Sequence, residues 1–265
     1  MIYREAAVPR TMQRAAFCAW QFVLEPHDPP LVQHQVPPDG TTNLGLMRQP
    51  DGSLSAFQVG PTLAAFTVPV PQGSVSCGLR LRPEAAQAVT GRAPAVGHME
   101  MLELDGRFAG VLRDLAAWAV GDPAPDLTAS AALLAGTSGD EAISRAVDLL
   151  VGTGGTVPIS SLCAGAGLSD RQFRRRFLAA TAVTPKQYAD VQRVRNALIM
   201  ALTEPSWAAV AHESGYADQP HLARSIKERF GSAACRVGGY FGGMRHEMLV
   251  PGDGRKVQDA PATIG

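Results

Sequence analysis

The chain has 265 residues, and its 24 lysines and arginines balance 24 aspartates and glutamates. Hydrophobic residues make up 46 % of the chain, which excludes a disordered protein because such a chain can build a core. Charged residues make up 18 %, below the roughly 25 % of a typical soluble domain. The length predicts one or two domains, with two favoured.

Local features exclude other classes of protein. The four cysteines, Cys18, Cys77, Cys163 and Cys235, are too few and too scattered for a disulfide framework or a zinc site. No apolar run approaches the roughly 18 residues of a membrane-spanning helix, and the first ten residues lack the apolar core of a signal peptide. These features predict a soluble, cytoplasmic protein in a reducing environment, without a membrane partner.

The zero net charge hides a difference between the two halves of the chain. Residues 1–157 contain 10 basic and 15 acidic residues, whereas residues 158–250 contain 12 basic and 7 acidic residues. Because a basic region attracts polyanions, this asymmetry indicates a nucleic-acid partner for the second half.

The first 83 residues have the pattern of short strands separated by turns. Residues 74–82 alternate, with Val75, Cys77, Leu79 and Leu81 on one face. Similar apolar runs occur at 17–24, 31–36, 54–59 and 63–70. Strands about ten residues apart, separated by proline and glycine turns, predict a small barrel-like or sandwich domain.

From Glu84 onward the apolar period is that of helices. It predicts helices over 107–120 and 140–151, with a loop over 121–130 between them. The glycine-rich segment 152–158 follows, and we expect it to link two domains. This segment lacks the Gly-Lys-Ser/Thr ending of a phosphate-binding loop and follows a helix instead of a strand, so it does not predict a nucleotide site.

The helical region 159–241 contains a repeat. The segments 159–177 and 207–230 each begin with a short apolar helix, pass through a glycine (Gly167 or Gly215) and end in an amphipathic helix that carries arginine on its outer face. Each unit has the helix-turn-helix pattern.

Capping residues place the second helix of the first unit. Ser169 and Gln172 have the spacing of a capping box. The pattern predicts a core face formed by Phe173, Phe177 and Leu178.

A long helix over 184–202 is predicted between the two units. Thr184 and Gln187 predict a second capping box, and Pro185 suits the first turn of a helix. The predicted buried stripe contains Tyr188, Val191, Val194, Leu198, Ala201 and Leu202. This helix would fix the separation of the two units.

Arg171, Arg174 and Arg175 are predicted on the outer face of the first unit. Arginines neutralise phosphates and donate paired hydrogen bonds to guanine O6 and N7. A solvated basic face is the simpler interpretation, but the duplicate unit, the turn glycines and the basic charge of the region favour DNA. Two such helices on one connecting helix suit successive major grooves, about 34 Å apart.

Residues 158–241 resemble the DNA-binding domain of the AraC/XylS family of bacterial transcription regulators. The motifs are ISSLCAGAGLSDRQFRRRF, TPKQYADVQRVRNALIMAL and AAVAHESGYADQPHLARSIKERFG. The resemblance implies that the DNA-binding residues are Arg171, Gln172, Arg174 and Arg175 in the first unit and Gln219, Pro220, His221 and Arg224 in the second.

The second unit departs from the family pattern at its recognition helix. Ala217 stands where the family often has serine, so we expect Asp218 to be the cap. Pro220 has no N–H group to donate. We therefore expect the first unit to dominate the recognition of DNA sequence.

Residues 1–151 more weakly resemble the sensory domain of some of these regulators, through VPPDGTTNLGL, VGPT and CGLRLRPEAA. This resemblance implies a domain that binds a small effector or forms a homodimer, and it leaves contact with RNA polymerase open. We expect an α+β protein located in the cytoplasm and associated with the nucleoid when bound to DNA. Its expected parts are a small β-barrel-like domain with following helices (1–151), a linker (152–158), an all-α domain of two helix-turn-helix units joined by a long helix (159–250) and a disordered tail (251–265).

Two alternatives remain open. The N-terminal barrel could be a ligand-binding or enzymatic domain fused to a DNA-binding domain, or the helices could be a protein-docking module beside a non-catalytic β-rich domain. Catalysis is not predicted, because His27, His34 and His98 lack metal-ligand spacing and no nucleophile elbow occurs. We expect these histidines in loops or on the surface, Cys18 and Cys77 in the core, and neither a metal nor a cofactor.

Overall fold

A computed structural model describes residues 1–121, 124–249 and 256–257. The strands are β1 (Ile2–Ala7), β2 (Ala16–Val23), β3 (Leu31–Val36), β4 (Asn43–Arg48), β5 (Leu54–Val59), β6 (Phe66–Pro71), β7 (Val75–Leu81), β8 (Met99–Leu102), β9 (Arg245–Leu249) and β10 (Lys256–Val257). The helices are the 3-10 turn η1 (Arg10–Met12) and α1 (Ala86–Thr90), α2 (Ala109–Val120), α3 (Thr128–Leu134), α4 (Glu141–Gly152), α5 (Ile159–Ala166), α6 (Asp170–Thr181), α7 (Pro185–Met200), α8 (Trp207–Glu213), α9 (Gln219–Phe230) and α10 (Ala234–Gly242).

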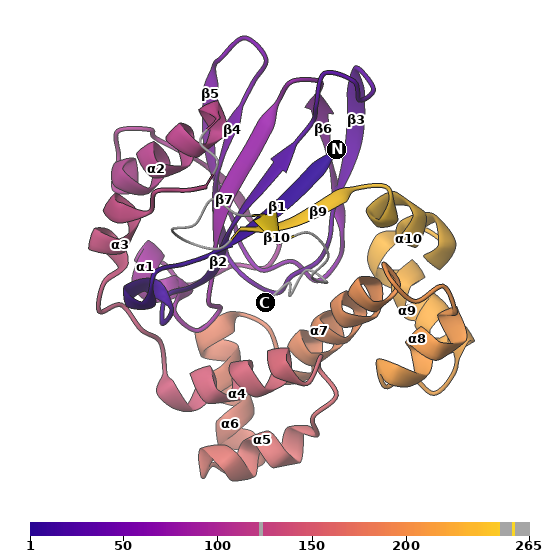
Figure 1. The fold of residues 1–265 in the computed structure, drawn as a ribbon. Coiled ribbons are helices and arrows are strands. Elements are labelled where there is room, and N and C mark those ends of the chain that lie inside the picture. Colours follow the sequence, from indigo (N-terminus) through magenta and orange to yellow (C-terminus); the bar gives the residue numbers. More distant parts are fainter. Residues whose placement is uncertain (122–123, 250–255, 258–265) are drawn as a thin grey trace.

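Eight strands form one sheet in the order β10-β9-β1-β2-β7-β4-β5-β8, and β3 pairs with β6 in a separate antiparallel sheet of two strands, the β3–β6 strand pair (Figure 1). Neighbouring strands in the sheet are antiparallel except β1 and β9, which are parallel with Ile2 opposite Arg245. The chain therefore returns after its last helix and adds a strand beside its first one.

The two faces of the large sheet have different partners. Helices α2 and α3 cover one face, where Leu79 of β7 packs in the same core as Leu115 and Trp118 of α2. Ser76 and Arg80 of β7 point to the other face, toward the β3–β6 strand pair. The α+β class with a β-rich N-terminal part is confirmed. The described strands form an open sheet and a separate pair of strands, and they do not close into a barrel.

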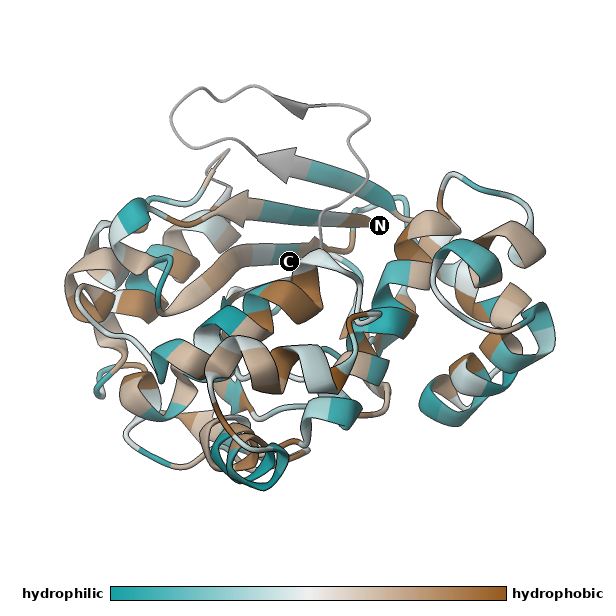
Figure 2. Cartoon of the chain, turned by 90° about the horizontal axis from the view of Figure 1, so that it is seen from below, coloured by the Kyte–Doolittle hydropathy of each residue, from teal (hydrophilic) through white to brown (hydrophobic). Residues whose placement is uncertain are grey.

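The helices from α4 onward form two groups around α7 (Figures 1 and 2). The first core combines Leu150 of α4 and Phe177 of α6 with Tyr188 in the first half of α7. The second combines Leu198 in the second half of α7 with Ile226 of α9 and with residues of α8 and α10. One helix thus contributes to both cores, as the sequence predicts.

Three expectations of the sequence stand corrected. The predicted loop over 121–130 is shorter, since α3 already begins at Thr128, and the strand expected from residue 63 begins at Phe66. Leu178 is 46 % exposed, whereas Phe173 and Phe177 are buried. The reason is helical geometry: Phe173 and Phe177 are four residues apart on one face, and the next residue is turned about 100° away.

Two further expectations concern the ends of the chain and its helices. The predicted disordered tail 251–265 lies outside the described residues, except for the two residues of β10. Within the part of the chain that the structure describes, no helix is both long and apolar enough to cross a membrane.

The adjacent pair Phe177 and Leu178 provides a stability test. Phe177→Ala should lower the free energy of unfolding by about 3–5 kcal/mol, because it leaves a cavity in the first helical core. Leu178→Ala should change it by roughly 0.5 kcal/mol or less, because that side chain faces water. Urea denaturation of both variants measures the difference, and equal losses would contradict the assignment of the two faces.

Candidate nucleic-acid interface and cavity

The first helix-turn-helix unit consists of α5, a tight turn and α6. Gly167 in the turn has a φ of +64°, a backbone conformation that favours glycine. Ser169 caps α6: its hydroxyl accepts a hydrogen bond from the N–H of Gln172, whose side-chain oxygen accepts one from the N–H of Ser169. The predicted capping box is confirmed.

The outer face of α6 presents the four residues that the sequence predicts to touch DNA. Arg171, Gln172, Arg174 and Arg175 are all exposed. Gln172 uses its side-chain oxygen in the helix cap, so its amide NH2 remains available as a donor. Arg174 donates from Nε to Asp170 Oδ2 at 2.8 Å.

Another arginine of α6 points toward the start of α4 instead. Arg176 donates from Nε and Nη2 to Asp140 Oδ2, at 2.9 and 2.5 Å. Asp140 also caps α4 by accepting from the N–H groups of Ala142 and Ile143. Although partial burial raises the pKa of Asp140, the hydrogen bond from Arg176 and those from the helix N–H groups lower it more, and the net shift is downward. This ion pair fixes α6 to α4.

The second unit, α8 and α9, repeats the arrangement with different chemistry. Gly215 in its turn has a φ of +74°, and a Cβ atom there would lie 2.9 Å from Thr156. Asp218 caps α9 by accepting from the N–H of His221 at 2.7 Å, which confirms the expected cap. Gln219, Pro220, His221 and Arg224 are exposed, as predicted. The face of this unit therefore carries one arginine where the first carries three.

Helix α7 connects the units and begins at the predicted capping box of Thr184 and Gln187. The glycine-rich segment before α5 packs against it. Arg193 Nη2 donates to Gly155 O at 3.1 Å, and a Cβ atom on Gly155 would lie 2.0 Å from Ala189 O. The segment thus fits closely between α4 and α7, and the expected boundary at 152–158 stays a prediction.

The helical region contacts the N-terminal sheet region on both sides of α7. Beside the first unit, Arg82, which follows β7, donates to Asp148 Oδ1 (2.7 Å) and Ser144 Oγ (3.0 Å) on α4. For the second unit, Arg229 Nη1 on α9 donates to Leu63 O at 3.0 Å, and Tyr240 on α10 contacts β3. Strand β9 then joins the sheet directly.

A partly open cavity of about 310 Å³ lies between the large sheet and the β3–β6 strand pair. Its walls are mostly apolar and include Trp20, Phe22, Phe57 and Val68. Trp20 therefore faces the cavity, and its indole N–H donates to Asn43 Oδ1 at 3.1 Å. Such a space, with few polar groups, suits a small apolar or amphipathic molecule.

Two arginines and Asp39 form the charged part of the cavity wall. Arg80 of β7 donates to Glu5 Oε1 (2.9 Å) and to the Tyr3 hydroxyl (3.0 Å), and its Nε lies 3.8 Å from Asp39 Oδ2. Burial opposes the charge of Arg80, but these neighbours prevail and raise its pKa. Arg80 is thus held in place by a carboxylate and a phenol.

Arg195 of α7 is the second arginine, and it is 4 % exposed. Its Nη1 makes a long hydrogen bond of 3.5 Å to Pro38 O, and its Nη2 has no hydrogen-bond partner among the described residues. Burial and the nearby charge of Arg80 lower the pKa of Arg195. Asp39 attracts it, but the oxygens of Asp39 accept from Thr41, Asn43 and Thr62 instead.

Sequence patterns missed Arg195 as a site residue, although one signal was present. It lies seven residues after Tyr188 and three before Leu198, within the buried stripe of α7. An arginine on an apolar stripe needs a partner or a polar space.

His34 corrects the expectation of a surface histidine. It lies on β3, partly buried, and stacks on Phe22 with ring centroids 3.9 Å apart. Its Nδ1 lies 2.8 Å from the hydroxyl of Tyr240 on α10, and burial lowers the pKa of His34 to about 4. A neutral His34 therefore helps to hold α10 against the β3–β6 strand pair.

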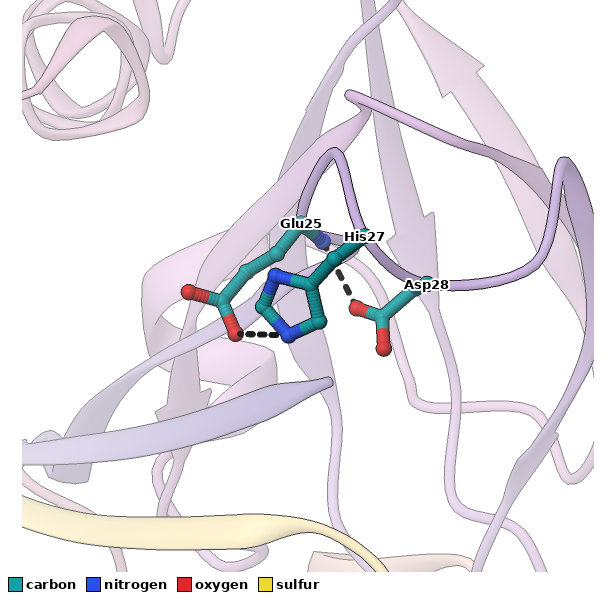
Figure 3. A group of neighbouring side chains, drawn as sticks. All are labelled: Glu25, His27 and Asp28. Atoms are coloured by element: carbon teal, nitrogen blue, oxygen red, sulfur yellow. Dashed lines mark hydrogen bonds and ion pairs between the residues drawn. The ribbon is translucent and has the colours of Figure 1, made fainter.

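One cluster has residue types that could bind a metal ion. The side chains of Glu25, His27 and Asp28 bring their ligand atoms within 4.8 Å of one another (Figure 3). Asp28 already accepts from the N-terminal ammonium group and from the N–H of Glu25, both at 2.8 Å. Glu25 pairs with His27 and with Arg245. These contacts account for the cluster without a metal.

The two cysteines that the sequence analysis expects in the core have a structural role. Cys18 and Cys77 are buried in the sheet region, and burial raises the pKa of each thiol to about 12. Neither is a reactive thiolate at neutral pH.

Comparison with known proteins matches residues 162–235 to a family described as a helix-turn-helix domain. The DNA-binding domain of AdpA, a global transcriptional factor solved in complex with a target DNA, is 26 % identical with a TM-score of 0.35, over 37 % of this chain and 91 % of that one. A probable AraC family transcriptional regulator from Rhodopseudomonas palustris CGA009 is 20 % identical with a TM-score of 0.35, over 38 % and 97 %. ToxT from Vibrio cholerae O395 is 9 % identical with a TM-score of 0.47, over 85 % and 97 %. None of the curated proteins compared with the sequence matches it.

The contact of His34 with α10 predicts a pH dependence of stability. Because the pKa of His34 is about 4 in the folded chain and about 6.5 when unfolded, the unfolded state binds more protons between these values. The free energy of unfolding should therefore fall as the pH falls from 6.5 toward 4, by up to about 1.4 kcal/mol per pH unit.

Urea denaturation of the wild type and His34→Gln between pH 4.5 and 7 measures this dependence. The variant should lose this part of the pH dependence, while contributions from other groups remain in both proteins. Parallel curves for the two proteins would contradict the prediction.

Proposed function

We propose that this chain is a DNA-binding transcription regulator of the AraC type, and that α6 and α9 are the two helices that read its operator. The observation that carries the proposal is the outer face of α6. Arg171, Arg174 and Arg175 are exposed there, while Phe173 and Phe177 lock the opposite face into the core. A rigid helix with arginines on one side is suited to the major groove.

The connecting helix supports a two-groove arrangement. Helix α7 has 16 residues, so it is about 24 Å long, and α6 and α9 pack near its opposite ends. Successive major grooves on one face of B-DNA are about 34 Å apart. We propose that the two helices enter adjacent grooves of an asymmetric site.

The two units divide the reading of sequence unequally in this proposal. Arg171, Arg174 and Arg175 supply guanine contacts and phosphate neutralisation, and the amide NH2 of Gln172 adds a donor near the helix start. The second unit contributes through Gln219, Pro220, His221 and Arg224. With only one arginine among them, the second unit has less capacity for paired guanine contacts.

A division of labour between residues 1–151 and 159–250 remains part of the proposal. The β-rich part would sense and the helical part would bind DNA, with α4 packed into the first helical core and β9 into the sheet. A regulator of this kind would act on the chromosome in the bacterial cytoplasm. We propose no enzymatic activity and leave homodimerisation and contact with RNA polymerase as further partners.

The cavity supports regulation by a small effector with an apolar body and an anionic group. An anion beside Arg195 would give its Nη2 a partner and offset the repulsion between Arg195 and Arg80. Arg195 belongs to α7, which carries both helix-turn-helix units. An effector that favours one position of Arg195 would therefore shift the arrangement of the recognition helices.

The proposed DNA contacts predict sequence-specific, salt-dependent binding. Selection from a random duplex library should enrich one motif of roughly two helical turns, and binding should weaken with salt at a log–log slope near −5 for about six phosphate contacts. The triple variant Arg171→Ala, Arg174→Ala, Arg175→Ala should lose the enrichment. Arg174→Ala alone should lose more base discrimination than His221→Ala.

A matched control removes the same charge elsewhere. Arg10, Arg14 and Arg113 are exposed arginines outside the helical units, and their replacement by alanine should leave the enriched motif unchanged. Binding without salt dependence or sequence preference would instead support a protein-docking module.

The effector proposal predicts a charge-selective ligand response. Octanoate should raise the melting temperature, since a ligand at a hundredfold its Kd stabilises a protein by about 2.7 kcal/mol. The alcohol 1-octanol, which has the same chain without the charge, should raise it less. Arg195→Gln should abolish the difference, and Arg193→Gln, two residues earlier on α7 and bonded to Gly155, should keep it. Equal responses to acid and alcohol would contradict an anion site.

A further inference from the structure

Asp170, the first residue of α6, links a side chain of its own helix to one of α5. Arg174 Nε donates to Asp170 Oδ2 at 2.8 Å, and Cys163 Sγ on α5 lies 3.8 Å from Asp170 Oδ1. Both oxygens of Asp170 thus have a partner. We propose that Asp170 is a positioning residue that orients Arg174 for guanine and lowers the affinity for non-specific DNA, an inference that rests on the proposed function.

The geometry leaves the guanine-binding edge of Arg174 open. A guanidinium group has five N–H donors, and the described residues engage only Nε of Arg174. Its Nη1 and Nη2 groups form a second fork, and the side chain is 49 % exposed. Guanine presents O6 and N7 as paired acceptors in the major groove, which this fork can meet at once. Because Asp170 already restricts the side chain, less conformational freedom is lost on binding.

The other arginines of α6 are placed differently. Arg176 is bonded to Asp140 of α4. Arg171 and Arg175 form no ion pair with the residues that the structure describes. They are therefore suited to phosphates, where a flexible charge suffices, whereas Arg174 is the arginine with a fixed orientation.

Asp170 also acts on the electrostatics of binding. A carboxylate on the face that meets DNA repels phosphates and opposes sequence-independent attraction. The hydrogen bond from Arg174 lowers the pKa of Asp170, so the charge persists at neutral pH. Burial raises the pKa of the Cys163 thiol, which keeps it protonated and able to donate. Asp170 can thus improve the discrimination between DNA sequences in two ways. It orients Arg174 for guanine, and it weakens sequence-independent binding to phosphates.

The acidic residue of the second unit that corresponds to Asp170 has a different role. Asp218 precedes α9 as its cap, and its Oδ1 accepts from the N–H of His221. The first residue of α9 is Gln219, which is uncharged. Among the residues that the structure describes, an ion pair between two residues of the same recognition helix occurs in the first unit alone, in accord with its larger proposed share of sequence reading.

Asp170→Asn in the full chain tests the proposal. The variant should bind random duplex about two- to threefold more tightly, because one repelling charge is removed. Its preference for guanine at the Arg174 position should fall by about fivefold or more, within the roughly 5- to 150-fold that one paired arginine–guanine contact supplies. In an Arg174→Ala background, Asp170→Asn should cause no further loss of preference.

Glu141→Gln is the matched control. Glu141 is likewise the first residue of its helix and pairs with an arginine four residues on, Arg145, at 3.2 Å. It should change neither affinity nor base preference measurably. Melting temperatures of all variants, followed by circular dichroism, identify any loss of helix.

Two outcomes would overturn the proposal. Equal weakening of specific and random binding by Asp170→Asn would mean that Asp170 only stabilises α6. An unchanged guanine preference would mean that Arg174 needs no orientation. If the wild type itself selects no sequence, the proposed function fails and the inference fails with it; a wild type that selects a motif and a variant that behaves identically reject the inference alone.

Discussion

The structure depends on one helix that is buried on more than one side. Helix α7 packs Tyr188 into the first helical core and Leu198 into the second, and it presents Arg195 to the cavity of the β-rich part. Because a helix of 16 residues is a stiff rod, these contacts cannot move independently. The separation of the two recognition helices and the charge in the cavity wall are therefore properties of the same element, which is the physical basis for linking effector and DNA.

Contacts at both ends of the helical part restrict its position further. Arg82 is buried where β7 ends and donates to Asp148 and Ser144 of α4. At the other end, Arg229 and Tyr240 contact the segment around β3 and β6, and β9 pairs with β1. Arg82 also pairs with the buried Glu84 at 2.6 Å, so its compensated guanidinium group bridges the sheet region and α4.

Features that depend on neighbours in sequence could be predicted from the sequence. The caps Ser169, Thr184 and Asp218 lie where the patterns place them, and Gly167 and Gly215 have the positive φ that their turns require. These are interactions over three or four residues, so the local pattern contains the information. The outward direction of the α6 arginines follows as well, because the opposite stripe contains the phenylalanines.

The remaining features were decided by tertiary structure. Helical and strand periodicity assign a face to Arg195, Arg80 and His34. Only the packing of the sheet, the β3–β6 strand pair and α7 brings those faces together to form a cavity. The pairing of β9 with β1 joins residues more than 240 positions apart, and no local pattern specifies such a partner. The sequence by itself determined the tandem units, their caps and their exposed arginines, since short-range hydrogen bonds and amphipathic periodicity suffice. The cavity, the buried Arg195 in its wall and the attachment of the helical region to the sheet required the tertiary structure, since long-range packing alone decides which groups lose contact with water.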